Sequence, residues 1–99
     1  MAEKNVPEAR LHAIVHGRVQ GVGFRYHTTH AAQELGVTGW VANRWDGTVE
    51  TVAEGSKEDL DKFVSFLHQG PSSAMVLRVE SEWLAPNGEF NNFRVHYTL

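Results

Sequence analysis

The sequence of 99 residues contains no cysteine. This absence excludes disulfide bonds, thiolate metal sites and a cysteine nucleophile. No apolar stretch approaches membrane-spanning length, and residues 1–10 contain charges and a proline where a secretory signal would have an apolar run. The missing disulfides fit a reducing compartment. We therefore expect a cytoplasmic protein that does not associate with membranes.

An excess of basic residues is also missing. Nine Lys and Arg residues against 12 Asp and Glu residues give a formal net charge of -3. Such a chain has no positive field to recruit nucleic acid, so we expect no nucleic-acid partner, and any bound anion must be held by local geometry. The length and a hydrophobic content of 41% are typical of one soluble globular domain, which we expect to be monomeric.

Hydrophobic periodicity divides the chain into elements. Residues 1–8 are expected to be a flexible tail, and residues 9–99 a single domain. Leu11, Ala13 and Val15 alternate with polar residues, which is typical of a half-buried strand. The expected strands are residues 10–19, 37–45, 48–53 and 76–83, with a short fifth strand around 93–97. The expected helices are residues 24–35 and a segment that Ser56 caps and Gly70 ends.

The order of these elements predicts the fold. Strand, helix, strand is followed by strand, helix, strand, and a terminal strand is added. Two such split units give an α+β fold, the ferredoxin-like α/β sandwich (βαββαβ). Its sheet is mainly antiparallel, with four to five strands and both helices on one face.

Residues 17–25 read as the end of a strand, a glycine-rich turn and the start of a helix. Gly21 and Gly23 allow backbone conformations that expose several N–H groups in one concave loop. The helix N-terminus adds a partial positive charge, and Arg25 adds a guanidinium that can grip two oxygens of one phosphate. The pattern favours a phosphate-sized anion. The alternative is a tight strand–helix turn with Arg25 in solvent.

Three better-known phosphate loops do not fit this segment. A dinucleotide fingerprint that starts at Gly21 needs a sixth-position glycine where the chain has Tyr26, and no Gly-Lys-Ser or Gly-Lys-Thr ends a Walker loop. Cysteine-dependent phosphatases place the nucleophile six residues before the arginine, where this chain has Val19. The loop would therefore be a cradle without its own nucleophile, so a reaction would have to use water or another residue.

Together with a second segment, the loop resembles the acylphosphatase family, over about residues 11–97. The first family signature is apolar-x-Gly-x-Val-Gln-Gly-Val-x-Phe-Arg, and it is met by Val15, Gly17, residues 19–22, Phe24 and Arg25. The second is Gly-aromatic-Val-x-Asn, three residues, Gly-x-Val, five residues, Gly, and it is met by residues 39–41, Asn43, Gly47, Val49 and Gly55.

The resemblance implies hydrolysis of acyl phosphates, small-molecule substrates, to a carboxylate and inorganic phosphate, with no metal and no cofactor. By resemblance, Arg25 binds the phosphate and Asn43 positions the attacking water. The remaining substrate-binding residues are those whose loop amides would hold the phosphoryl oxygens: Gln20, Gly21, Val22, Gly23 and Phe24. Such a sparse set suits the chemistry, because a departing carboxylate with a pKa of about 4 needs no general acid.

Some residues near Asn43 differ from the family or invite other readings. Ala42 stands where many relatives have a basic residue, and Arg44 is not expected to replace it, because adjacent strand residues face opposite ways. Trp45 is considered as a wall for the acyl side of the substrate. Asn43 by itself is also typical of a polar residue near the end of a strand.

Two other functions and a metal site are alternative interpretations of this sequence. The six histidines lack an accompanying ligand motif and are expected at the surface or half-buried. A non-catalytic module that binds acyl or carbamoyl phosphate remains open, because such domains also occur within larger proteins. An RNA-binding module would need aromatic residues in a basic pattern on the central strands, but residues 48–54 contain acids and no aromatic residue.

Overall fold

The structure is a computed structural model that describes residues 6–97, and its elements follow one another in the expected order. They are β1 (Ala9–Arg18), α1 (Phe24–Leu35), β2 (Thr38–Asn43), β3 (Val49–Gly55), α2 (Lys57–Gln69), β4 (Met75–Leu84) and β5 (Phe93–His96). Residues 1–5 of the expected tail lie outside the described residues. Within the described part of that tail, the Glu8 amide donates a hydrogen bond of 2.9 Å to the carbonyl of Gly55.

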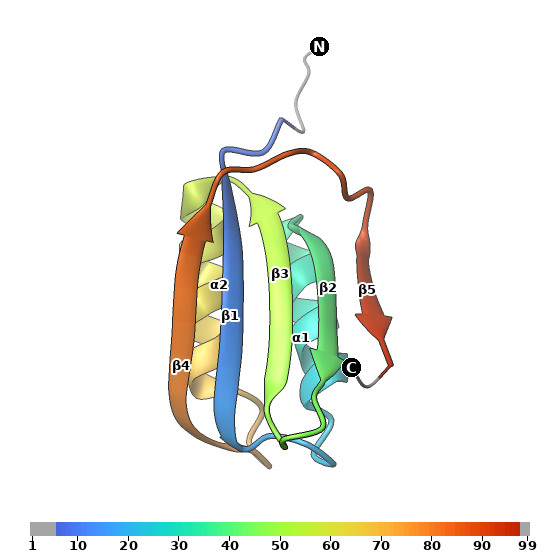
Figure 1. Ribbon diagram of the computed structural model, residues 1–99, viewed down its shortest axis with the longest axis vertical. Coiled ribbons are helices and arrows are strands. Elements are labelled where there is room, and N and C mark those ends of the chain that lie inside the picture. Colours follow the sequence, from blue (N-terminus) through green and yellow to red (C-terminus); the bar gives the residue numbers. More distant parts are fainter. Residues whose placement is uncertain (1–5, 98–99) are drawn as a thin grey trace.

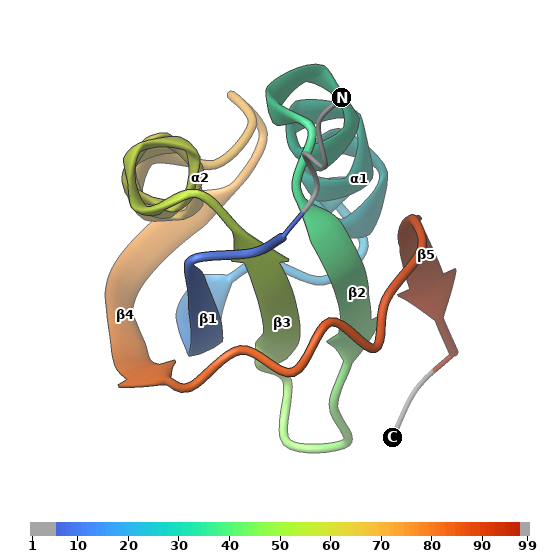
Figure 2. The ribbon, with the colours of Figure 1, turned by 90° about the horizontal axis from the view of Figure 1, so that it is seen from above.

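The strands form one sheet in the order β4-β1-β3-β2-β5 (Figure 1). Its neighbours are antiparallel, except that β2 and β5 are parallel. Both helices cover one face of the sheet, and the β4–β5 connection runs along the opposite side (Figure 2). The predicted ferredoxin-like α+β architecture is therefore confirmed.

The alternation along β1 decides which side becomes the core. Leu11, Ala13 and Val15 are fully buried against the helices, as predicted. Aromatic rings fill the space between the layers, with Phe63 of α2 lying edge-on to Phe93 of β5 at 5.8 Å between ring centroids. Helix α2 also begins as expected, because the Ser56 hydroxyl accepts a hydrogen bond from the Asp59 amide.

The second strand is shorter than predicted. It ends at Asn43, whereas residues 37–45 were expected, and Arg44 and Trp45 belong to the turn before β3. The cause is Asp46, whose carboxylate accepts hydrogen bonds from the amide and the hydroxyl of Thr48, while the Gly47 amide donates to the Arg44 carbonyl. These local bonds compete successfully with strand pairing.

Gly17 sits where β1 bends into the loop before α1. The register between β1 and β4 shifts at His16 and Gly17, which marks a β-bulge. Gly17 has φ +132°, and a Cβ there would lie 2.1 Å from the carbonyl oxygen of Met75. Only glycine fits this close approach. The glycine therefore sets the direction in which the chain leaves the sheet.

Three connections meet at one end of the sheet: the β1–α1 loop, the β2–β3 hairpin and the α2–β4 connection (Figure 1). At the other end, the buried carboxylate of Glu54 holds the β4–β5 connection, because it accepts hydrogen bonds from the amides of Asn87 and Gly88 and from Arg10. Neither helix within residues 6–97 is long and apolar enough to cross a membrane.

Candidate active site

The glycine-rich loop opens directly into α1. Gly21 and Gly23 have φ values of 74° and 77°, a left-handed conformation that favours glycine. Gly23 caps α1 without a side-chain hydrogen bond, and the first turn of α1 contains no acidic residue. The N–H groups of that turn, which have no partner inside the helix, therefore combine with the positive end of the helix dipole to favour an anion.

Arg25 and Asn43 line one cleft of about 360 Å³ at this end of the sheet. Arg25 lies in the first turn of α1, and Asn43 is the last residue of β2. The full lining is Val19, Gly21, Gly23, Phe24, Arg25, Tyr26, Thr29, Asn43 and Val95. Spacing alone left open whether Arg25 and Asn43 face one pocket, and the tertiary structure brings them together.

The guanidinium of Arg25 is anchored to the last strand. Its Nη1 donates a hydrogen bond of 3.2 Å to the carbonyl oxygen of His96. A guanidinium has five N–H groups, so one bond of this kind leaves donors for an oxyanion. One turn later, the Thr29 hydroxyl donates to the Arg25 carbonyl at 2.9 Å. The side chain is thus held at the cleft from the β5 side.

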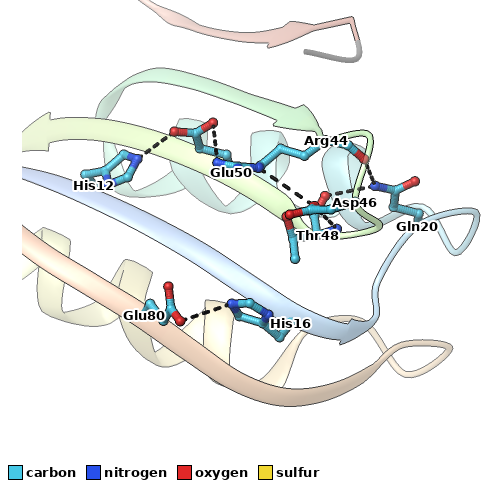
Figure 3. Close-up of polar contacts among 8 residues, drawn as sticks. All are labelled: His12, His16, Gln20, Arg44, Asp46, Thr48, Glu50 and Glu80. Atoms are coloured by element: carbon cyan, nitrogen blue, oxygen red, sulfur yellow. Dashed lines mark hydrogen bonds and ion pairs between the residues drawn. The ribbon is translucent and has the colours of Figure 1, made fainter.

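Gln20 and Val22 belong to the predicted loop but do not line the cleft. The Gln20 side-chain amide donates to the carbonyl oxygens of Arg44 and Thr48 in the hairpin (Figure 3). The Val22 carbonyl accepts a hydrogen bond of 3.0 Å from the Ser73 hydroxyl in the α2–β4 connection. What these two residues could offer a phosphate is their backbone N–H, and that role stays a prediction.

Arg44 points to the sheet face opposite Asn43, as predicted. Its Nη1 lies 3.4 Å from Glu50, whose other carboxylate oxygen lies 2.6 Å from His12 (Figure 3). Neither Arg44 nor Ala42 lines the Arg25–Asn43 cleft, and Ala42 is fully buried and pairs with Glu50.

The suggestion that Trp45 walls the acyl side of the substrate is wrong. The Trp45 residue is 85% exposed, and it borders a separate hollow with Arg44, Asp46 and Glu50. The early end of β2 explains the error, because the turn carries the indole away from the cleft.

Four residues of the lining were not predicted as site residues: Val19, Tyr26, Thr29 and Val95. Thr29 could have been found, because it follows Arg25 by four residues and shares its helical face. Val95 had no local signal, because it reaches the cleft only through the pairing of β5 with β2.

The turn beside the site holds a carboxylate that stays ionised. Hydrogen bonds from the hydroxyl and amide of Thr48, together with the charge of Arg44, lower the pKa of Asp46 below its ordinary value. The hydrogen bonds in the turn after Asn43 therefore favour the ionised carboxylate. Histidines are half-buried or exposed as expected, and residues 6–97 contain no group of three or more His, Asp or Glu side chains that could hold a metal ion.

Comparison with known proteins identifies the family of the chain. The acylphosphatase family model matches residues 11–95. A curated acylphosphatase from Pelotomaculum thermopropionicum is 49% identical over 89 residues, which cover 90% of this chain and 97% of that protein.

Solved structures show the same likeness. An acylphosphatase from Coxiella burnetii aligns with a TM-score of 0.87 and 38% identity, covering 97% of this chain and all (100%) of that one. Full-length HypF in a phosphate- and nucleotide-bound form aligns with a TM-score of 0.81 and 26% identity, but the match covers 94% of this chain and only 12% of HypF. Family model, curated relatives and fold agree over nearly the whole length, and the chain belongs to the acylphosphatase family.

Proposed function

We propose that this protein hydrolyses the carboxyl–phosphate bond of acyl phosphates to a carboxylate and inorganic phosphate. Family membership supports acyl phosphate hydrolysis. The observation that carries the residue assignment is the shared cleft, in which Arg25 and Asn43 meet the glycine-rich loop. The substrate is a small molecule whose phosphoryl group enters this loop.

In this proposal the charge of the phosphoryl group is held by the loop amides of residues 20–24 and by Arg25. Phosphoryl transfer depends mostly on positioning and on charge stabilisation, so a ring of N–H donors and one guanidinium are sufficient. The left-handed Gly21 and Gly23 and the α1 N-terminus support this role.

We assign to Asn43 the positioning of the attacking water. Its amide offers both a donor and an acceptor, so it can orient a water molecule in line with the scissile bond. As the new bond from the water oxygen to phosphorus forms, the bond from phosphorus to the acyl oxygen breaks and the carboxylate departs with the electron pair. Because Asn43 is a poor base, we assign the water's proton to a phosphate oxygen.

The test is phosphate release from acetyl or benzoyl phosphate with excess chelator present. We expect turnover that the chelator leaves unchanged, because the proposal uses no metal. Absence of turnover, or turnover that the chelator abolishes, contradicts the proposal. The monomeric state is a further proposal that light scattering checks, and the cytoplasmic location is one that fractionation of the source cells checks.

A second candidate is a module that binds a phosphorylated carboxylate or carbamate without cleaving it. The observation in its favour is that HypF, a much longer chain, contains a similar domain. Saturable binding of inorganic phosphate without any turnover of acyl phosphates would select it. An RNA-binding module has no support at β3, because this strand places the acidic Glu50 on the face opposite the helices. A filter-binding assay with RNA tests this alternative.

A further inference from the structure

The side chain of Gln20 spans the gap between the glycine-rich loop and the β2–β3 hairpin. Its Nε2 donates two hydrogen bonds of 2.8 Å, one to the Arg44 carbonyl and one to the Thr48 carbonyl (Figure 3). A primary amide has two N–H groups, so both are used. The half-buried side chain is therefore committed to the hairpin and does not line the cleft.

The two carbonyls that receive Gln20 close the turn next to Asn43. The Thr48 carbonyl also accepts the Arg44 amide at 2.9 Å, and the Arg44 carbonyl also accepts the Gly47 amide at 3.1 Å. The last β2–β3 pair is Asn43 with Val49, so Arg44 and Thr48 are the first residues beyond it. Gln20 thus bonds to the backbone immediately after Asn43.

Gln20 is also the residue before Gly21, at the start of the loop that leads to Arg25. One side chain therefore joins the two halves of the candidate site. We propose that Gln20 is a positioning residue that fixes Asn43, and with it the attacking water, relative to the phosphate loop. This inference rests on the proposed function, because it assigns Gln20 a part in the same reaction.

Removal of this bridge should separate water positioning from phosphate binding. The loop keeps its second tie through Ser73 and Val22, and Arg25 keeps its bond to the His96 carbonyl. Phosphate should therefore still bind. Alignment of the water depends on the hairpin, and a displacement of about 1 Å in a reacting group can cost on the order of 100-fold in rate.

The first variant is Gln20→Met, which keeps the length of the side chain and removes both donors. We expect kcat for benzoyl phosphate to fall about 10- to 100-fold, while the inhibition constant of inorganic phosphate changes less than about threefold. Amide hydrogen exchange at Arg44 and Gly47 should become faster, because their acceptors lose the bridging side chain. The matched control is Gln33→Met, which removes an exposed glutamine amide from α1 and should leave all three measurements unchanged.

The second variant is Gln20→Glu, which points carboxylate oxygens at two carbonyl oxygens. At neutral pH we expect kcat below that of Gln20→Met, because acceptors face acceptors. Protonation restores one donor, so the ratio of its kcat to that of the parent should rise as the pH falls below about 5. A role limited to general packing would give a ratio that does not change with pH.

Three outcomes overturn the inference. They are unchanged kcat in Gln20→Met, parallel loss of kcat and phosphate affinity, or hairpin amide exchange equal to that of the parent. If Gln20→Met does not fold, the inference is tested by the pH dependence of the ratio of kcat in Gln20→Glu to kcat in the parent. A ratio that does not change with pH then overturns it. If the parent protein itself does not turn over acyl phosphates, the proposed function fails, whereas the amide exchange still reports whether Gln20 fixes the hairpin.

Discussion

The guanidinium of Arg25 donates a hydrogen bond of 3.2 Å to the backbone carbonyl of His96. His96 pairs with Ala42 in the parallel β2–β5 ladder, and Asn43 is the next residue along β2. The last strand therefore connects the cation of the site to the strand that carries the amide. This contact joins residues 71 apart in the sequence, and it explains how one cleft collects both groups.

Arg25→Ala should weaken phosphate binding and turnover together. The guanidinium is the permanent charge at the loop, and loss of one charge-stabilising donor costs on the order of 100- to 1,000-fold in kcat. Inhibition by inorganic phosphate and steady-state kinetics on benzoyl phosphate measure the two effects. Unchanged phosphate inhibition would place Arg25 outside the binding site.

Asn43→Ala should give a different profile. We expect kcat to fall at least about 100-fold, because the water loses its orienting amide, whereas the inhibition constant of phosphate should stay within about threefold of the parent. Comparison with Arg25→Ala under the same conditions separates orientation from binding. A rate near that of the parent removes Asn43 from the mechanism.

Asp46→Asn should alter the acid stability of the protein. The hydrogen bonds that Asp46 accepts from Thr48 lower the pKa of its carboxyl group. The contribution of this carboxylate to the free energy of unfolding is therefore complete above the ordinary Asp pKa of about 3.9. It is lost as the pH falls through the lower pKa of the folded state. The variant should be less stable than the parent at pH 7, and the difference should shrink below about pH 4.

Urea unfolding of the parent and Asp46→Asn at a series of pH values measures this difference. Asp61→Asn, which removes a carboxylate from the exposed face of α2, controls for the loss of one negative charge. If the difference in the free energy of unfolding between the parent and Asp46→Asn stays constant down to acid pH, the assigned role of the carboxylate is wrong.

Glu54→Gln should destabilise the fold and spare the chemistry. The buried Glu54 carboxylate accepts hydrogen bonds from Arg10 and from the amides of Asn87 and Gly88, and an amide in its place presents a donor to donors. Disruption of a buried charged contact of this kind costs about 3 kcal/mol. Thermal or urea unfolding measures the loss.

Because Glu54 lies at the other end of β3 from the site, kcat per folded molecule should stay at the level of the parent. The exposed Glu58→Gln on α2 is the control and should change stability by less than about 0.5 kcal/mol. Equal stability of the parent and Glu54→Gln would show that the β4–β5 connection does not depend on this carboxylate.

The local patterns were sufficient to predict the elements. Alternation at residues 11–15 and helical spacing at residues 24–35 each predict one element and its buried face. This prediction does not depend on which other element packs against that face. The end of β2 was predicted two residues late, because the side-chain bonds of Asp46 and Thr48 are decided by the folded turn. Because β2 ends before Trp45, this residue lies in the exposed turn and does not line the cleft.

The sequence by itself determined that the chain carries a glycine-rich loop ending in Arg25, an asparagine 18 residues later, and the order of elements that predicts the sheet. Only the tertiary structure decided that Arg25 and Asn43 share a cleft, that Val95 lines it, and that Gln20 bonds to the hairpin rather than pointing into the cleft. The physical reason is that spacing fixes directions within one element, whereas contacts between elements depend on strand pairing and on where backbone carbonyls come to lie.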